Sequence, residues 1–197
     1  MKNTIYLVVG SVLCLAGCSP AKVRDNLSYS PVIETQEKKQ ITLALETFED
    51  KRSEGKIIGN FKDILGITLA EITTEQNIPQ WITNAIKTEL SNAGYSVVDA
   101  PLSDGYSING NILRVFNKVR FGRDSSVVVE IALKKGQEVV FNKTYETHSN
   151  GTINCTDGDK TWKEYTTPSE GFKLNLQEIC REVITDLNRE LFSTSLN

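Results

Sequence analysis

The chain has 197 residues, of which 39% are hydrophobic and 24% charged, with 22 Lys and Arg against 25 Asp and Glu. A net charge of −3, with basic residues spread among acidic ones, argues against nucleic-acid binding, which usually needs a clustered positive face. The sequence has one histidine and no glycine-rich phosphate loop, metal-spaced Cys/His set or Gly-x-Ser-x-Gly motif, so we expect no enzyme activity, cofactor or metal.

The first 17 residues have the features of an export signal. Lys2 precedes an uncharged apolar run over residues 5–17, which at about 13 residues is shorter than the ~20 of a membrane-spanning helix. The run ends in Leu15-Ala16-Gly17-Cys18, which matches the lipobox of bacterial lipoproteins. We therefore expect cleavage between Gly17 and Cys18 and attachment of diacylglycerol and palmitate-type acyl chains to Cys18. An ordinary secreted protein or an uncleaved signal anchor is the alternative.

The residues after the lipobox predict where the protein is held. Ser19 stands where an inner-membrane retention signal would have Asp, which by the sorting rule of enteric bacteria favours the outer membrane, with the domain facing the periplasm. Three acyl chains hold a protein durably, because each buried methylene contributes about 0.8 kcal/mol. Residues 18–39 are polar, contain prolines and lack periodicity, which predicts a flexible tether before a single domain over residues 40–197.

The first ordered elements are expected to be strands. Apolar and polar residues alternate over residues 40–48, which predicts a strand that ends in the charged sequence Glu49-Asp50-Lys51-Arg52. Two β-like runs follow, over 57–61 and 64–72, and together they predict a hairpin.

A helix is then predicted between two end signals. Asn77 and the following proline suit its start, apolar residues recur at helical spacing from Trp81 to Ala93, and Gly94 ends the pattern.

The rest of the chain alternates again and then returns to helical spacing. The expected elements are strands over 95–98, 106–119, 125–134 and 138–147, a loop over 149–167, and a helix over 168–191. The last three strands predict an antiparallel meander. The element order predicts an α+β fold, a two-layer sandwich in which two main helices cover one face of a mostly antiparallel sheet.

Two of the four cysteines are candidates for a disulfide bond. Cys14 leaves with the signal and Cys18 is lipidated, so Cys155 and Cys180 are the free pair in an oxidising compartment. Their bond would close a loop of about 25 residues and stabilise the fold by ~3 kcal/mol in the chain-entropy model. The alternative is that both remain thiols, with Cys180 buried on a helix face.

Three groups of residues are candidates for partner binding. Trp162 and Tyr165 lie in the long polar loop, where an exposed aromatic pair suits recognition, although Trp162 is equally suited to cap the core. Asp50 and Arg52 end the first strand, either as a site or as a structural charge pair. A group of basic residues near one strand and its turn is suited to lipid headgroups or peptidoglycan acids, or else forms a solvated face: Arg114, Lys118, Arg120 and Arg123.

Several segments together resemble the YajG-type bacterial lipoproteins. They are the strand ending in Asp50-Lys51-Arg52, a glycine-punctuated hairpin, the helix 81–93 stopping at Gly94-Tyr95-Ser96-Val97, the meander, and the closing helix 174–191. The resemblance implies an envelope lipoprotein without an assigned activity, and the 149–167 insertion departs from it. More loosely, the layout is similar to lipoprotein activators of peptidoglycan synthases and to auxiliary lipoproteins of lipid-transport ABC systems.

These observations predict a non-enzymatic outer-membrane lipoprotein whose domain binds another envelope protein or peptidoglycan. The alternative is a lipid-binding auxiliary component of an envelope transport system, which would need an apolar groove between the helices and the sheet. An enzyme would need His148 or Asp50 to act.

Overall fold

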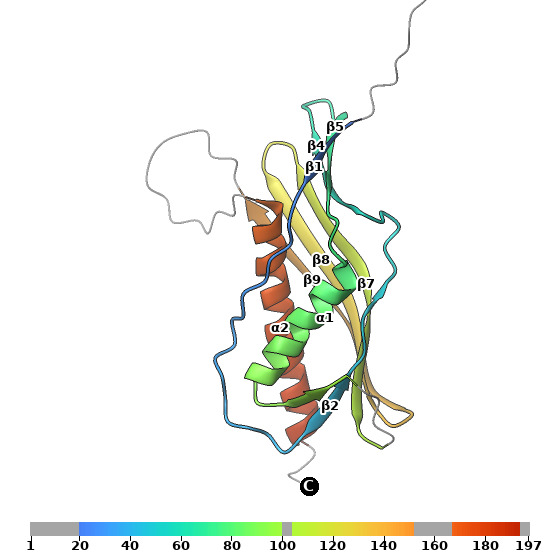
Figure 1. The fold of residues 1–197 in the computed structure, drawn as a ribbon, viewed down its shortest axis with the longest axis vertical. Helices are drawn as coiled ribbons and strands as arrows, with labels where there is room; N and C mark the ends of the chain where they lie inside the picture. Colours follow the sequence, from blue (N-terminus) through green and yellow to red (C-terminus); the bar gives the residue numbers. More distant parts are fainter. Residues whose placement is uncertain (1–19, 100–103, 152–166, 194–197) are drawn as a thin grey trace, which may run out of the picture.

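The computed structural model describes residues 20–99, 104–151 and 167–193. In these ranges a nine-stranded mixed sheet runs the length of an elongated molecule, with two helices beside it (Figure 1). The elements in chain order are β1 (Ala21–Arg24), β2 (Thr42–Leu45), β3 (Glu49–Asp50), β4 (Ile57–Lys62), β5 (Thr68–Thr73), α1 (Ile78–Asn92), β6 (Ser96–Val98), β7 (Tyr106–Val119), β8 (Arg123–Lys135), β9 (Glu138–Gly151) and α2 (Pro168–Ser193).

The meander β7–β8–β9 is the longest part of the sheet and confirms the predicted antiparallel strands. β7 and β8 pair from Tyr106 with Lys135 to Val119 with Arg123, and β8 pairs with β9 over a similar length. From Val127 to Lys134, β8 alternates between residues that face the helices and residues that face away, because successive side chains of a strand point to opposite faces.

The N-terminal strands join this meander in a different way from the one expected. β2, β3 and β4 each pair with β7 in parallel, β6 pairs with β2 and β1 with β5 in parallel, and only the β4–β5 hairpin is antiparallel. Five of the eight strand pairs in the described ranges are therefore parallel. The fold is α+β, but the expectation of an antiparallel sheet holds only for the meander and the β4–β5 hairpin, because alternation identifies a strand without identifying its partner.

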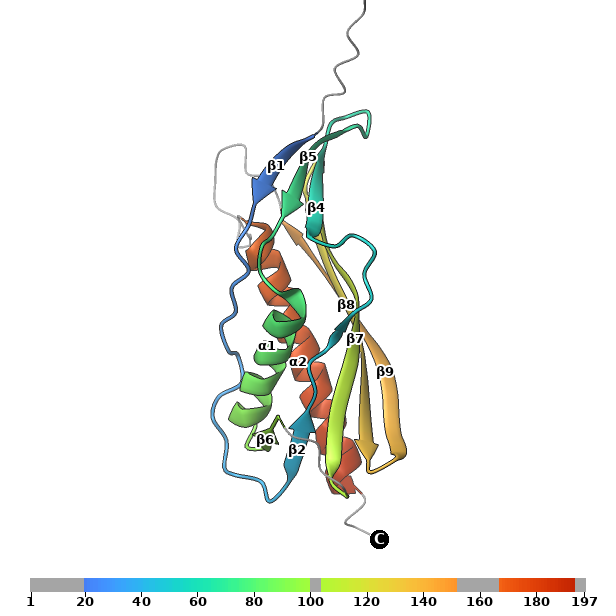
Figure 2. The ribbon, with the colours of Figure 1, turned by 45° about the vertical axis from the view of Figure 1, so that its right-hand side comes forward.

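Both predicted helices are present and lie on the same side of the sheet (Figure 2). The Asn77 side chain accepts a hydrogen bond from the Gln80 amide at 3.0 Å and caps the start of α1. The helix ends just before Gly94, whose φ of 90° is a conformation that favours glycine. The side chains buried between the helices and the sheet form one core, and its members with no exposed surface include Leu43, Ile82, Leu90, Ile108, Ile112, Val129, Ile131, Phe172, Leu176, Ile179 and Leu187. Neither described helix has the combination of length and apolarity that crossing a membrane requires.

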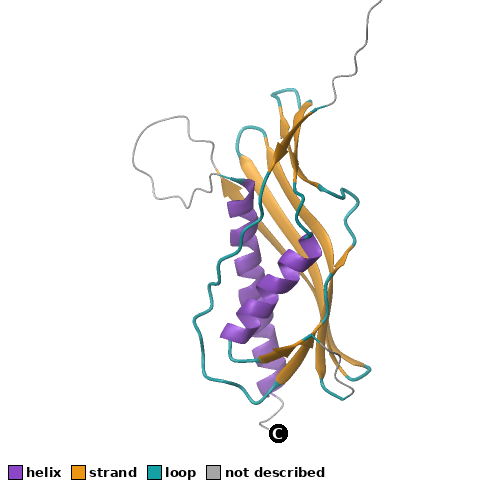
Figure 3. Cartoon of the chain, viewed as in Figure 1, coloured by secondary structure: helices purple, strands orange, loops and turns teal. Residues whose placement is uncertain are grey.

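Residues 20–39 pack against the domain, in contrast to the flexible tether that the sequence predicts. β1 pairs with β5, and residues 25–39, which we call the strap, then run along the helices toward the far end of the molecule (Figure 3). Leu27 in the strap is 5% exposed, and its backbone bonds to the side chain of Gln76. Further along, the amides of Gln36 and Lys39 donate to the carbonyls of Asn92 and Gly94, both at 2.7 Å.

The buried carboxylate of Glu89 in α1 holds the middle of the strap. It accepts hydrogen bonds from the Tyr29 hydroxyl at 2.5 Å, the Val32 amide at 2.7 Å and the Ile33 amide at 2.9 Å. Glu89 has no exposed surface, and buried carboxylates are retained where such bonds compensate the loss of water. The strap lacks apolar periodicity because most of the contacts that hold it are hydrogen bonds, three of them to the single side chain of Glu89.

Candidate functional site

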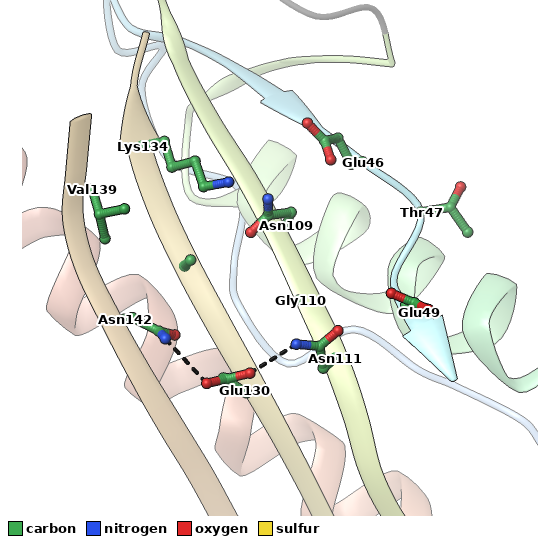
Figure 4. A pocket seen from close by; sticks show the side chains of 11 residues that line it. Glu46, Thr47, Glu49, Asn109, Gly110, Asn111, Glu130, Lys134, Val139 and Asn142 are labelled. Atoms are coloured by element: carbon green, nitrogen blue, oxygen red, sulfur yellow. Dashed lines mark hydrogen bonds between the residues drawn. The ribbon is translucent and has the colours of Figure 1, made fainter. Parts of the chain in front are cut away.

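A polar depression of about 390 Å³ lies on the sheet face that the helices leave open (Figure 4). The β2–β3 segment forms one wall, and the outward-facing residues of the meander form the floor. Its lining residues are Glu46, Thr47, Glu49, Asn109, Gly110, Asn111, Glu130, Ala132, Lys134, Val139 and Asn142.

The strand register explains why this face is polar. On β8 the outward residues Glu130, Ala132 and Lys134 alternate with Ile131 and Leu133, which point to the helices and have no exposed surface. Residues opposite each other on neighbouring strands then meet: Asn111 is paired with Glu130, and Asn142 lies diagonally across from it.

Glu130 is the fixed acceptor at the centre of the depression. It accepts hydrogen bonds from the Asn111 amide nitrogen at 2.8 Å and the Asn142 amide nitrogen at 3.0 Å (Figure 4). These two bonds lower the pKa of Glu130 below its usual range, because they stabilise the ionised form. The carboxylate is thus held ionised between two oriented amides, and Lys134 contributes an ammonium group to the lining of the same depression.

The wall formed by the β2–β3 segment is held in place by a close contact at Gly110. A Cβ atom there would lie 2.6 Å from the Phe48 ring, so only glycine leaves room for the buried Phe48 ring, 2% exposed, to pack against β7. The Phe48 amide donates to the Thr83 hydroxyl at 3.0 Å, which ties the β2–β3 segment to α1. The position of Glu46 and Glu49 beside the meander therefore depends on this contact.

Asp50 and Arg52 form an ion pair next to the depression and do not line it. The Arg52 guanidinium donates to both Asp50 carboxylate oxygens, at 2.9 and 2.8 Å, and to the Gly55 carbonyl at 2.9 Å. Partial burial would raise the pKa of Asp50, but the hydrogen bonds and charge of Arg52 lower it on balance. The Arg52 side chain is only 2% exposed, so the pair closes the loop after β3.

Cys180 is a free thiol in the structure, so the predicted disulfide with Cys155 is not supported. The thiol is 1% exposed on the core side of α2, where Tyr29 of the strap is its neighbour. Cys180 therefore fits the alternative interpretation of a buried helix-face residue. Cys155 lies outside the described residues.

Four other residues with predicted roles also lie outside the described ranges: Gly17 and Cys18 of the lipobox, and Trp162 and Tyr165 of the long loop. Their roles stay predictions.

His148 is placed on the exposed side of β9. It contacts the Glu146 carboxylate at 3.0 Å and the Asp124 carboxylate at 3.8 Å, and it lines a second depression of about 340 Å³ between β9 and α2. Two acidic neighbours suit a surface ion pair. Among the described residues, no group of three or more His, Cys, Asp or Glu side chains is arranged to hold a metal ion.

Sequence reasoning missed the polar depression. Its members come from four separate strands or linkers, and only the strand register brings Asn111, Glu130 and Asn142 together. The available signal was that each of the three meander strands has an asparagine or a glutamate at an outward position, where threonine or valine would be ordinary.

Comparison with known proteins supports the fold. No family model matches the chain, and no curated protein matches it. Among solved structures, a protein from Xanthomonas campestris described by the family model DUF330 aligns with a TM-score of 0.62 and 11% identity, over 90% of this chain and 99% of that chain. An uncharacterised protein aligns with a TM-score of 0.51 and 12% identity, over 86% and 99%. A lipoprotein from Neisseria meningitidis aligns with a TM-score of 0.39 and 8% identity, over 76% and 99%.

These likenesses show a shared fold with the first two proteins. The third likeness is too distant to support an argument, and the resemblance to the YajG-type lipoproteins stays a prediction.

Proposed function

We propose that this protein is a non-enzymatic lipoprotein of the bacterial envelope, anchored at the outer membrane, whose periplasmic domain binds another envelope protein or peptidoglycan. The observation that carries the binding role is the polar depression on the sheet face that no helix covers. The observation that carries the anchor is the lipobox ending in Cys18.

The chemistry of the depression suits a partner rich in amides, hydroxyls and ammonium groups. Glu130 and Glu49 supply carboxylate acceptors, Asn109 supplies an amide, and Lys134 supplies a cation. Glu130 is held by two amides before any partner arrives, so less side-chain freedom is lost on binding. Peptide chains and peptidoglycan stems both present the groups that such a surface recognises.

Photo-crosslinking in living cells tests the binding role. A photoreactive residue at position 134 or 142 reports on the depression, and one at 178, on the exposed side of α2, is the matched control. We expect adducts with one defined protein or with peptidoglycan from the first two positions only, and their loss in a Glu130→Lys background. If neither position gives a specific adduct while the protein is abundant, the depression is not the binding surface. Positions 162 and 165 test the loop prediction in the same cells.

The anchor has a separate test. A Cys18→Ala chain should leave the membrane fraction, because the acyl chains have lost their attachment atom. A chain that still fractionates with the outer membrane would contradict the anchor.

The lipid-carrying alternative needs an apolar groove between helices and sheet. In the described residues that space is filled by core side chains such as Leu43, Ile86 and Phe172, each at most 1% exposed. Co-purification of stoichiometric phospholipid would favour the alternative over a binding domain.

A further inference from the structure

Most of the exposed large hydrophobic side chains of the described residues lie at one end of the molecule. Six of nine gather where the β4–β5 turn and the β7–β8 turn meet the start of β1, and these six define the apolar tip: Val23, Ile64, Leu65, Ile67, Leu69 and Phe121. The two turns are in contact, because the Arg120 guanidinium donates to the Ile64 carbonyl at 2.6 Å. Leu65 is 78% exposed and Phe121 75%, so the ends of both turns are apolar and uncovered.

The β4–β5 turn is built to hold its side chains outward. The Asp63 carboxylate accepts hydrogen bonds from the Leu65 amide at 2.9 Å and the Ile67 amide at 2.8 Å, and Gly66 takes a φ of 88°. On the neighbouring turn the Arg120 guanidinium stacks 5.1 Å from the Phe121 ring centre. Fixed turns of this kind hold apolar side chains in contact with water. This exposure does not stabilise the isolated domain, so the exposed apolar surface indicates a binding partner.

The tip is also the most basic part of a chain that is acidic overall. The tip segments 21–24, 62–69 and 118–123 contain six Lys or Arg residues and one acidic residue, against a net charge of −3 for the whole chain. The acidic residue is Asp63, which is engaged with the backbone of its own turn. Apolar side chains flanked by cations are the composition of segments that bind anionic lipid surfaces.

The chain itself brings this end of the domain to the membrane. β1 begins at Ala21, which pairs with Ala70 next to the β4–β5 turn, so the polypeptide enters the domain at the tip (Figure 1). Cys18 is three residues earlier, and three extended residues span at most about 10 Å. A lipid on Cys18 would therefore hold the tip within one headgroup layer of the bilayer.

We propose that the apolar tip inserts into the interface of the anionic phospholipid membrane that carries the Cys18 anchor. This inference rests on the anchor of the proposed function. Leu65 and Phe121 enter the acyl boundary, and the basic side chains around them contact headgroup phosphates. The insertion sets the orientation of the domain, with its long axis away from the bilayer and the polar depression on its flank.

Vesicle binding by the unlipidated mature chain isolates the tip from the anchor. The Cys18→Ser chain is sedimented with vesicles of phosphatidylethanolamine and phosphatidylglycerol, and the double variant Leu65→Asp, Phe121→Asp is compared with it. We expect the double variant to lose at least about tenfold in partition coefficient, because two apolar side chains no longer leave water. Leu113→Asp is the matched control, since Leu113 is 43% exposed on β7, eight positions before Phe121, and does not line the polar depression, so it should bind unchanged. All variants should retain the urea midpoint of the parent chain, since the changed side chains are exposed.

A depth measurement in the lipidated protein tests the same contact in the anchored state. A cysteine introduced at position 65, 121 or 113 of a Cys155→Ser chain is labelled with an environment-sensitive fluorophore, and its quenching by lipids brominated at known depths is measured. The labels at positions 65 and 121 should be quenched and blue-shifted, and the label at position 113 should not.

Three outcomes would overturn the proposal. The first is equal vesicle binding by the tip and control variants, the second is no vesicle binding by the Cys18→Ser chain at any lipid composition, and the third is tip crosslinking to a protein with no quenching by lipid. The membrane fractionation of the Cys18→Ala chain is read independently. Failure of the anchor and failure of the tip are therefore distinguished.

Discussion

The Glu89 carboxylate joins the strap to α1 through three hydrogen bonds, and their contribution to the free energy of unfolding can be measured. In Glu89→Gln an amide group replaces one acceptor oxygen and faces backbone N–H donors, so buried donors are left unpaired. We expect the free energy of unfolding to fall by about 2–4 kcal/mol, because unmet buried groups cost about 1–3 kcal/mol each. Tyr29→Phe, which removes one bond, should cost about 1 kcal/mol. Urea denaturation measures both.

The control for this change is Glu178→Gln on the exposed side of α2. A surface substitution of the same chemistry should change the unfolding free energy by less than about 0.5 kcal/mol. Equal effects at positions 89 and 178 would mean that the strap is not held by Glu89.

Cys180 gives the fold a pH dependence in the alkaline range. Burial raises the pKa of its thiol from the usual 9.0 to about 12. In the unfolded chain the thiol ionises from about pH 9, whereas in the folded chain it keeps its proton to about pH 12. The stability is therefore full below pH 9 and is lost progressively as pH rises from 9 to 12, with a limiting slope of about 1.4 kcal/mol per pH unit.

Urea titrations at pH 8, 9 and 10 check this dependence, and the comparison with Cys180→Val separates the thiol from the tyrosines, whose usual pKa is about 10. In Cys180→Val the loss between pH 9 and 10 should be smaller than in the natural chain, because the titrating group is gone while the apolar volume remains. A folded protein whose Cys180 reacts rapidly with a thiol reagent at pH 8 would contradict the buried position.

At the level of elements, Gly94 is where α1 ends and the strap passes over it. A Cβ atom at Gly94 would lie 2.1 Å from the Glu37 carbonyl oxygen, whereas at Gly66 it would meet no atom within 4 Å. The two glycines have nearly equal φ values, 90° and 88°, so Gly94→Ala and Gly66→Ala carry the same backbone strain of about 1–2 kcal/mol. Gly94→Ala should cost at least about 2 kcal/mol more, because the strap must also move. Equal unfolding free energies of the two variants would refute the strap contact.

The elements that the sequence predicts well are the ones held by periodic apolar residues. α1, α2 and the meander are present because apolar residues repeat at 3.6 or 2 positions and pack on one core. The strap could not be found in this way, since its partners in α1 lie 56 to 60 positions away and its bonds are polar. The one available signal was Glu89 itself, a charged residue among the apolar positions of a helix face.

The candidate site was less predictable than the elements. Asp50 and Arg52 were found by their position at a strand end, but they form a structural pair beside the depression. The depression depends on which residues of β7, β8 and β9 stand opposite one another, and on the packing of Phe48 against Gly110. Both features are set by the tertiary structure, because alternation alone leaves strand partners and register undetermined.

For the whole molecule, the path of the N-terminal segment decides how the domain would be linked to the proposed anchor at Cys18. The chain enters at β1, runs the length of the helices as the strap, and begins β2 near the far end (Figure 2). A flexible tether would let the domain move away from the lipid, whereas the strap makes the first 20 residues of the ordered chain part of the fold. Any pull on the proposed anchor would then act on β1 and the strap together with the sheet.

Replacing strap residues 25–35 with a Gly/Ser sequence of equal length tests this view. The replacement keeps the chain length but removes Leu27, Tyr29 and Ile33, so a buried leucine and the strap bond of the Tyr29 hydroxyl are lost. We expect the free energy of unfolding to fall by about 3–5 kcal/mol from the sum of these effects, or the chain to fail to fold. The control replaces only the exposed residues Glu34 and Thr35 with serine and should change stability by less than about 0.5 kcal/mol. An unaltered urea midpoint in the Gly/Ser chain would instead support the prediction of a flexible tether, because a tether contributes nothing to the stability of the domain that it carries.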